Sequence, residues 1–321
     1  MFKNGMKSTA EEASENLRNK CLFEAGLSYS VGAVLPLAAS LLMTIICTLA
    51  SPKSSAYEQT DWYAYLGYLL PQLCLAATAV VYFYRSKEPF RAMLPACKWY
   101  YFPIAIIMQF GLLFPLSELN GLFISLLQKL GYRESLGALP ALTGWNLLPA
   151  ILVIAVLPAI FEETLFRGII SRNLHASGWG AVSVVFTAGA LFSLYHGNPS
   201  QTLYQFICGV CLTLVMVKSG SVYPTMVAHF LNNAAILTLE STGYGTAWQM
   251  PLGAYIAVQV VASLCLLGSL AFLIFFRRRD FQTGKPAHGK KFAFGAIAGI
   301  VVCAIQWLVL LVVGFLPPRA Q

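Results

Sequence analysis

The chain has 321 residues, of which 58% are hydrophobic and only 11% are charged. Soluble domains carry about 25% charged residues, so this composition excludes an ordinary soluble protein and indicates an integral membrane protein. The formal net charge of +8 does not indicate nucleic-acid binding. The basic residues lie in short loops between apolar segments, where they set the orientation of a membrane protein, and we expect no nucleic-acid partner.

Apolar segments follow one another along most of the chain. Residues 1–27 are polar and mixed in charge, and we expect a cytoplasmic arm there rather than a cleavable signal peptide. About 20 apolar residues cross a bilayer, and continuous apolar runs indicate helices rather than a barrel. The predicted spans are residues 28–50, 62–84, 99–126, 147–172, 181–197, 202–218, 222–240, 252–276 and 292–316.

These runs predict an all-α fold, a polytopic transmembrane helix bundle of about nine spans. Eight spans remain the alternative, because the sixth is short. All polar linkers are short, so we expect one membrane domain over residues 28–316, followed by a tail at 317–321.

The distribution of basic residues predicts the orientation. With a cytoplasmic N-terminus, seventeen of the 21 Lys and Arg residues fall on the cytoplasmic side. The other side receives only Lys53, Lys129, Arg133 and Arg319. We therefore expect a multi-pass protein of the cell membrane with its N-terminus inside. A bacterial plasma membrane is favoured, and the ER membrane is the alternative for a eukaryotic source.

Ionisable residues interrupt the predicted span at 147–172. A carboxylate at membrane depth costs roughly 2.5–3.5 kcal/mol on insertion scales, so such residues are functional by default. Glu163 and Arg167 lie four residues apart, in the order that favours an ion pair on one helix face. Glu162 is rotated by about 100° from Glu163 and is expected to remain available for proton transfer. Pro158, one turn earlier, lacks an N–H and is expected to loosen the helix there, with space for a water.

Two later spans carry polar residues at helical spacing. Phe192 and His196 share one helix face, and His229 and Asn233 share another. An imidazole and a carboxamide on one face form a suitable donor pair for an oxyanion. Asn232 is one step round the helix and is expected to point away, whereas Phe192 is expected to serve packing. The antiparallel helices bring the polar groups to overlapping depths, which leaves Glu162 facing both histidines and Asn233.

In this order the sequence contains three motifs: EExxxR, FxxxH and HxxxN. They begin at Glu162, Phe192 and His229. With these motifs the chain resembles the CPBP family, which comprises the type II CAAX prenyl endopeptidases and bacterial relatives linked to bacteriocin processing and immunity. The resemblance covers about residues 147–240, which would form the catalytic core.

The resemblance implies a glutamate-dependent intramembrane peptidase. Glu162, assisted by His196, would activate a water molecule, and His229 with Asn233 would stabilise the tetrahedral oxyanion. The remaining acid and base of the first motif would organise the helix or engage the substrate. The implied partners are the lipid bilayer and a peptide or protein in or at the membrane, either prenylated or a leader peptide. No cofactor and no metal ion are implied.

Other functions remain open. Two histidines and a glutamate resemble a zinc site with an open position, so a metal-dependent membrane endopeptidase is one alternative, although the sequence lacks HExxH. A non-cleaving bacteriocin-immunity or scaffold protein is another. A transporter is disfavoured because no paired halves or inverted repeats are visible.

Overall fold

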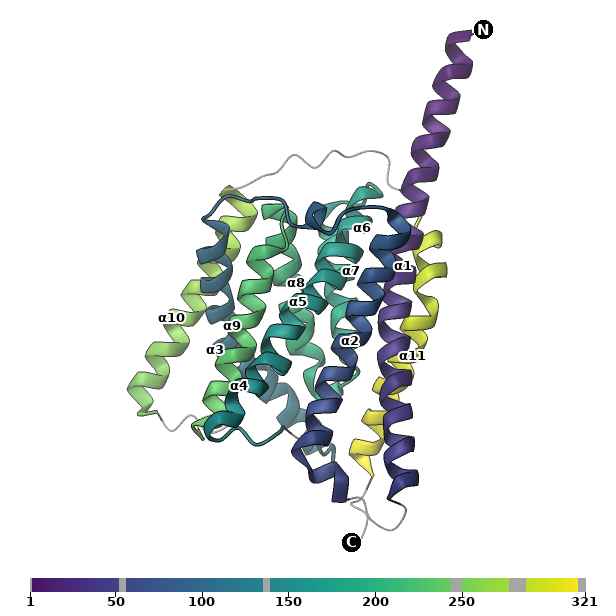
Figure 1. The fold of residues 1–321 in the computed structure, drawn as a ribbon. Coiled ribbons are helices and arrows are strands. Elements are labelled where there is room, and N and C mark those ends of the chain that lie inside the picture. The colour runs from purple at the N-terminus through teal and green to yellow at the C-terminus, as the bar shows by residue number, and fades with distance from the viewer. Residues whose placement is uncertain (1, 52–55, 135–138, 244–249, 277–286, 317–321) are drawn as a thin grey trace.

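Helices form the regular structure of the chain, and none of the described residues lies in a strand (Figure 1). The computed structural model describes residues 2–51, 56–134, 139–243, 250–276 and 287–316, with the backbone alone for residues 2–10 and 276. The predicted tail at 317–321 lies outside the described residues. The long helices are α1 (Phe2–Ala50), α2 (Asp61–Ser86), α3 (Tyr101–Lys129), α7 (Ala181–Tyr195), α8 (Thr202–Ser219), α9 (Tyr223–Ser241), α10 (Leu252–Ala271) and α11 (Lys290–Phe315).

A composite helix lies at the centre of the bundle, between α2, α7 and α9 (Figure 1). It consists of α4 (Leu147–Ala150), the π-helical η4 (Ile151–Val156), α5 (Leu157–Glu163), the π-helical η5 (Thr164–Ser171) and α6 (Arg172–Ala176). Short 3-10 turns, η1 (Ala56–Gln59), η2 (Phe90–Met93), η3 (Gly144–Asn146) and η6 (Pro199–Gln201), and the π-helical η7 (Phe272–Phe276) complete the elements.

The prediction of a polytopic helix bundle is confirmed. Each of the nine predicted spans coincides with a helical segment of the described chain, and seven of these segments are long and apolar enough to cross a membrane. The other two are α7, which has 15 residues, and α9, which carries the polar residues of the third motif. Helix α1 runs without a break from Phe2 to Ala50, so it continues the first span into the stretch where a cytoplasmic arm is predicted, and the location of that arm stays a prediction.

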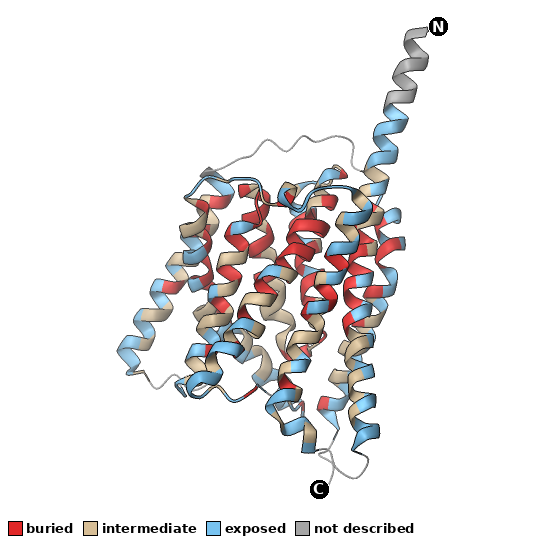
Figure 2. Cartoon of the chain, viewed as in Figure 1, coloured by how far each residue is buried: buried red, intermediate tan, exposed pale blue. Residues whose placement is uncertain are grey.

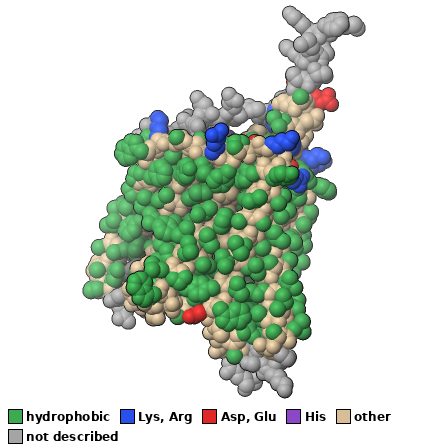
Figure 3. Space-filling model, viewed as in Figure 1, with side chains coloured by type: hydrophobic (Ala, Val, Ile, Leu, Met, Phe, Trp, Pro, Cys, Tyr) green, Lys and Arg blue, Asp and Glu red, His purple; other side chains and the backbone are tan. Residues whose placement is uncertain are grey.

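Buried residues concentrate in the central helix and its neighbours (Figure 2). All residues from 162 to 171 are buried, so this stretch contacts protein on every side instead of lipid. Arg167 belongs to it and has no exposed surface, so it cannot act as one of the loop charges that orient the protein. On the face drawn in Figure 3, the Lys and Arg side chains gather at the end where the N-terminus emerges. The cytoplasmic location of that end stays a prediction.

Helix α7 ends inside the bundle rather than at its far surface. It is about 22 Å long, against about 39 Å for the 26 residues of α2, at 1.5 Å per residue. Gly197 ends it in the left-handed conformation (φ 58°), and a Cβ there would lie 2.7 Å from Gln306 Nε2 of α11. Trp307 Nε1 of α11 donates to Thr202 Oγ1 at the start of α8, 2.8 Å away. The α7–α8 connection is therefore held at an intermediate depth.

Helices α1 and α11 touch through their backbones. A Cβ on Gly295 would lie 2.7 Å from Phe23 O, and one on Gly26 would collide with Phe292 O. Ser30 Oγ donates to Gly295 O (2.6 Å) and accepts from the Gly299 N–H (3.0 Å). Small residues that permit close approach, with a hydroxyl bonded across the interface, are the usual means of joining helices in lipid.

We predict that Gly295→Ala lowers the thermal stability of the detergent-solubilised protein, because the added methyl group overpacks a backbone contact, at a cost of about 1–3 kcal/mol. Gly268→Ala in α10 is the matched control. A Cβ at Gly268 meets nothing within 4 Å, so this variant should melt at or above the wild-type temperature. Equal melting temperatures for the two variants would contradict the packing described here.

Candidate active site

Proline and π-helical turns shape the central helix around the two glutamates. Pro158 has no N–H to offer Ile154 O, the carbonyl four residues before it. Asn233 Nδ2 of α9 donates to that carbonyl instead, at 3.1 Å. This carbonyl, to which Pro158 cannot donate, thus binds a side chain of a neighbouring helix. The π-helical segments η4 and η5 flank α5, and such irregular turns occur often at functional sites.

Glu163 is fixed by two partners. Its Oε1 accepts from Arg167 Nη1 at 2.6 Å, which is the ion pair expected from the sequence, and from His229 Nδ1 of α9 at 2.9 Å. The bond between His229 and Glu163 was not predicted from the sequence, which had grouped His229 with Glu162. A 100° rotation on one helix separates the two glutamates, but only the packing of α9 decides which of them the histidine meets.

Phe192 does more than fill space. The Arg167 guanidinium lies 4.4 Å from its ring centroid, and Arg167 Nη2 also donates to Gly209 O of α8 at 3.3 Å. The same ring contacts both histidines edge-on, with centroids 4.7 Å from His196 and 6.2 Å from His229. A ring face can stabilise a desolvated cation, so Phe192 both compensates Arg167 and packs against the two imidazoles.

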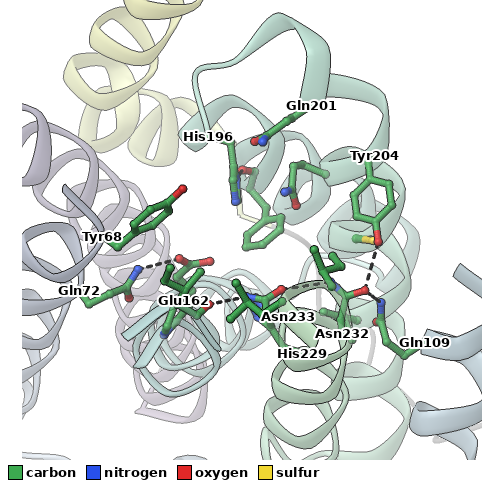
Figure 4. Close-up of a pocket in the computed structure, with 18 of the residues that line it drawn as sticks. Tyr68, Gln72, Gln109, Glu162, His196, Gln201, Tyr204, His229, Asn232 and Asn233 are labelled. Carbon is green, nitrogen blue, oxygen red and sulfur yellow. Dashed lines mark hydrogen bonds between the residues drawn. The ribbon is translucent and has the colours of Figure 1, made fainter. Parts of the chain in front are cut away.

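Glu162 has a different environment from its neighbour. It is 6% exposed, and in the described part of the chain no basic side chain forms an ion pair with it. Its Oε1 accepts a hydrogen bond from Gln72 Nε2 of α2 at 2.9 Å (Figure 4). The adjacent glutamates therefore divide as expected: Glu163 is neutralised, whereas Glu162 is held by a neutral donor.

Hydrogen bonds fix the orientation of both imidazole rings. His196 Nδ1 lies 2.8 Å from Phe192 O, and because a carbonyl only accepts, this nitrogen carries the proton. The neutral ring then presents the lone pair of Nε2. His229 is held in the same way, through Nδ1 and Glu163. In both rings the second nitrogen remains for a ligand, as is usual for functional histidines.

A cavity of about 300 Å³ joins the predicted site residues (Figure 4). Five of the seven residues singled out from the sequence line it: Glu162, Phe192, His196, His229 and Asn233. The other two, Glu163 and Arg167, lie behind this layer and do not line the cavity. Of the two roles that the resemblance implied for them, this placement favours organisation of the helix over contact with a substrate.

The sequence missed the carboxamide and phenol groups of the cavity. Gln72 of α2, Gln109 of α3 and Tyr204 of α8 line it, and so does Asn232, which was expected to point away. Asn232 is buried between α3 and α8, and residues 100° apart on α9 both reach the cavity because it wraps around that helix. The available signal was a pair of glutamines inside otherwise apolar spans, since polar groups there seek partners between helices.

The cavity is closed at the end near the N-terminus and opens at the other. Along α2 the lining changes from buried Gln72 to partly exposed Tyr68, and along α9 from buried His229 to Ile236, which is 37% exposed. These two helices run in opposite directions, so both gradients point to the same end of the bundle (Figure 1). Leu139, 42% exposed, lies at the open end.

Among the described residues, no group of three or more His, Cys, Asp or Glu side chains is arranged to hold a metal ion.

Fold and site together define a multi-pass membrane protein with an intramembrane polar cavity. Residues 144–235 match the family described as type II CAAX prenyl endopeptidase Rce1-like, and this stretch contains all three motifs. This central part of the chain is therefore similar to CAAX-type intramembrane proteases, and the match supports protease activity at the family level. Comparison with curated proteins gives no match, and comparison with solved structures gives none either.

We predict that the same substitution changes the stability of the protein at one of the adjacent glutamates and not at the other. Glu163→Gln leaves the buried Arg167 cation without its counter-charge, and breaking a buried pair costs about 3–5 kcal/mol. Glu162→Gln keeps an acceptor for Gln72 Nε2 and removes no ion pair, so it should melt close to the wild-type temperature. Thermal unfolding in detergent measures both. A Glu163→Gln variant as stable as Glu162→Gln would contradict the division of roles.

Proposed function

We propose that this protein is an intramembrane peptidase in which Glu162 is the general base. The observation that carries the proposal is the separation of the two glutamates. Glu163 is neutralised by Arg167, whereas Glu162 lines the cavity together with His196 and forms no ion pair with the described residues. A carboxylate that is kept beside a cavity at membrane depth, without a counter-charge, is expected to serve chemistry.

The reaction begins with a water molecule held between Glu162 and the Nε2 lone pair of His196. Glu162 takes a proton as the water oxygen bonds to the scissile carbonyl carbon, which gives a tetrahedral oxyanion. When the carbon–nitrogen bond breaks, the same proton passes to the departing amine. The products are one new carboxyl terminus and one new amino terminus.

His229 and Asn233 are the proposed oxyanion donors. Asn233 Nδ2 gives one of its two hydrogens to Ile154 O, and the second remains for the oxyanion. His229 already donates from Nδ1 to Glu163, so its Nε2 can donate to the oxyanion only when both ring nitrogens carry a proton. Donors fixed before the reaction, in a dry site, are the main source of such stabilisation.

We infer that the substrate is an apolar peptide segment that enters from the open end of the cavity. The apolar residues Leu139 and Ile236 line that approach, beside the ring of Tyr68. A prenylated C-terminus and an apolar leader peptide both have this character. The favoured setting is a bacterial plasma membrane, and the reaction as written uses no metal ion.

Glu162→Gln should abolish cleavage, since the amide cannot take the proton. We expect N-terminal proteomics of cells with the native protein, compared with cells carrying Glu162→Gln, to reveal peptide termini that only the native protein generates. Glu118→Gln, at an exposed position of α3, is the control and should retain them. Undiminished cleavage in Glu162→Gln would refute the mechanism. Activity lost to a chelator and restored by zinc would instead establish the metal-dependent alternative.

The direction of entry can be measured by labelling with a membrane-impermeant maleimide. A cysteine introduced at Leu139, at the open end, and one introduced at Arg85 should react with the reagent from opposite faces of the membrane. With a cytoplasmic N-terminus, Leu139→Cys is then labelled in intact cells and Arg85→Cys only in inverted vesicles. The unsubstituted protein, with its native cysteines, provides the background. Labelling of both variants from one face would contradict this direction.

A further inference from the structure

A chain of amide hydrogen bonds extends from the proposed oxyanion donor to helix α3 (Figure 4). Asn233 Nδ2 donates to Ile154 O at 3.1 Å, and Asn233 Oδ1 accepts from Asn232 Nδ2 at 3.1 Å. Asn232 Oδ1 in turn accepts from two donors, Gln109 Nε2 at 2.8 Å and Tyr204 Oη at 3.1 Å. The chain thus joins the central helix to α9, α3 and α8.

The direction of this chain is fixed at its Ile154 end. Amide oxygen and nitrogen have nearly the same shape, so hydrogen bonding decides which way an asparagine points. A backbone carbonyl only accepts, so Asn233 must present Nδ2 to Ile154 O. Asn233 Oδ1 then requires a donor, and Asn232 supplies one only while its own oxygen faces Gln109 and Tyr204.

We propose that Gln109, Tyr204 and Asn232 are positioning residues that hold the Asn233 amide with its N–H groups toward the oxyanion. The inference rests on the proposed function and deepens it. If the Asn233 amide turned over, its oxygen would face both Ile154 O and the oxyanion. Two donors on one Asn232 oxygen make the orientation redundant, because either donor alone still holds it.

The proposed chain of hydrogen bonds lies partly outside the family motifs. Gln109 is in α3, outside the matched residues 144–235, and Asn232 is not a motif position. Gln109 and Asn232 are both buried, where an amide hydrogen bond is stronger than in water and an unpaired partner is costly. A merely structural link between α3, α8 and α9 would contribute to stability, whereas a positioning link also sets the turnover rate.

A double-mutant cycle separates these roles. We expect Gln109→Met and Tyr204→Phe to lower kcat only a few-fold each, since the remaining donor still holds Asn232 Oδ1. The double variant should lose about 100-fold in kcat, the loss seen when one oxyanion donor is removed, with little change in KM. The probe is a quenched-fluorescent peptide spanning a cleavage site found by the proteomic comparison, with purified protein in detergent.

The decisive arm repeats the cycle in an Asn233→Ala background. With the positioned amide gone, Gln109→Met and Tyr204→Phe should no longer change kcat. Each should still lower the melting temperature, in this background and in the native one, because each removes a buried hydrogen bond. Asn232→Asp should also release the Asn233 amide, because a carboxylate cannot donate to Asn233 Oδ1, and it does so without removing side-chain volume. We expect this variant to lose about 100-fold in kcat as well. The control is the pair Gln259→Met and Tyr255→Phe in α10, residues of the same types away from the cavity.

The outcomes are distinct. The positioning role would be overturned if the loss of kcat in the double variant equalled the product of the single losses. It would also be overturned if these losses of kcat persisted in the Asn233→Ala background. Either result would leave the proposed peptidase function standing. Full cleavage by Asn233→Ala or by Glu162→Gln would instead refute the proposed function itself. Losses confined to KM would assign Gln109 and Tyr204 to substrate contact.

Discussion

The structure depends on a guanidinium buried in the centre of a membrane bundle. Removing an ion from water costs several kcal/mol, which Arg167 recovers only through partners that the surrounding helices supply. Glu163 contributes the counter-charge, Phe192 of α7 a ring face, and Gly209 of α8 a carbonyl oxygen. His229 of α9 then bonds the same carboxylate oxygen. One buried cation thereby sets how three helices approach the central one.

This constraint also explains why the two glutamates differ. Neighbouring positions on a helix point about 100° apart, so only one carboxylate can face the arginine. The Glu163–Arg167 pair positions two further residues: Glu163 bonds His229, and Arg167 contacts the ring of Phe192. Phe192 in turn packs against His196. Glu163 and Arg167, which do not line the cavity, therefore position the groups that do. Glu162 faces this prepared surface with only an amide, from Gln72, as its partner.

Sequence patterns predicted the helices and the residues of the three motifs, because apolar run length and four-residue spacing are local properties. They could not choose the partner of His229, since both glutamates lie within one helical step and only packing decides. They also missed Gln109 and Asn232. A carboxamide in an apolar span reveals that a partner exists, but the partner lies on a helix distant in sequence. The termination of α7 inside the bundle depends likewise on α11, which covers Gly197.

Irregular backbone completes the site. Peptide hydrolysis in a bilayer needs water and a polarised donor set, and an unbroken α-helix provides neither, because its carbonyls are all engaged. Pro158 withholds one N–H from the central helix, and the carbonyl that it cannot bond, Ile154 O, orients Asn233. Helix α7 stops at about 22 Å, so the cavity can open beside His196 toward one end only. Arg167 does not line this cavity but a separate pocket on the other side of the site, so its ion pair with Glu163 is kept apart from the water that the reaction needs.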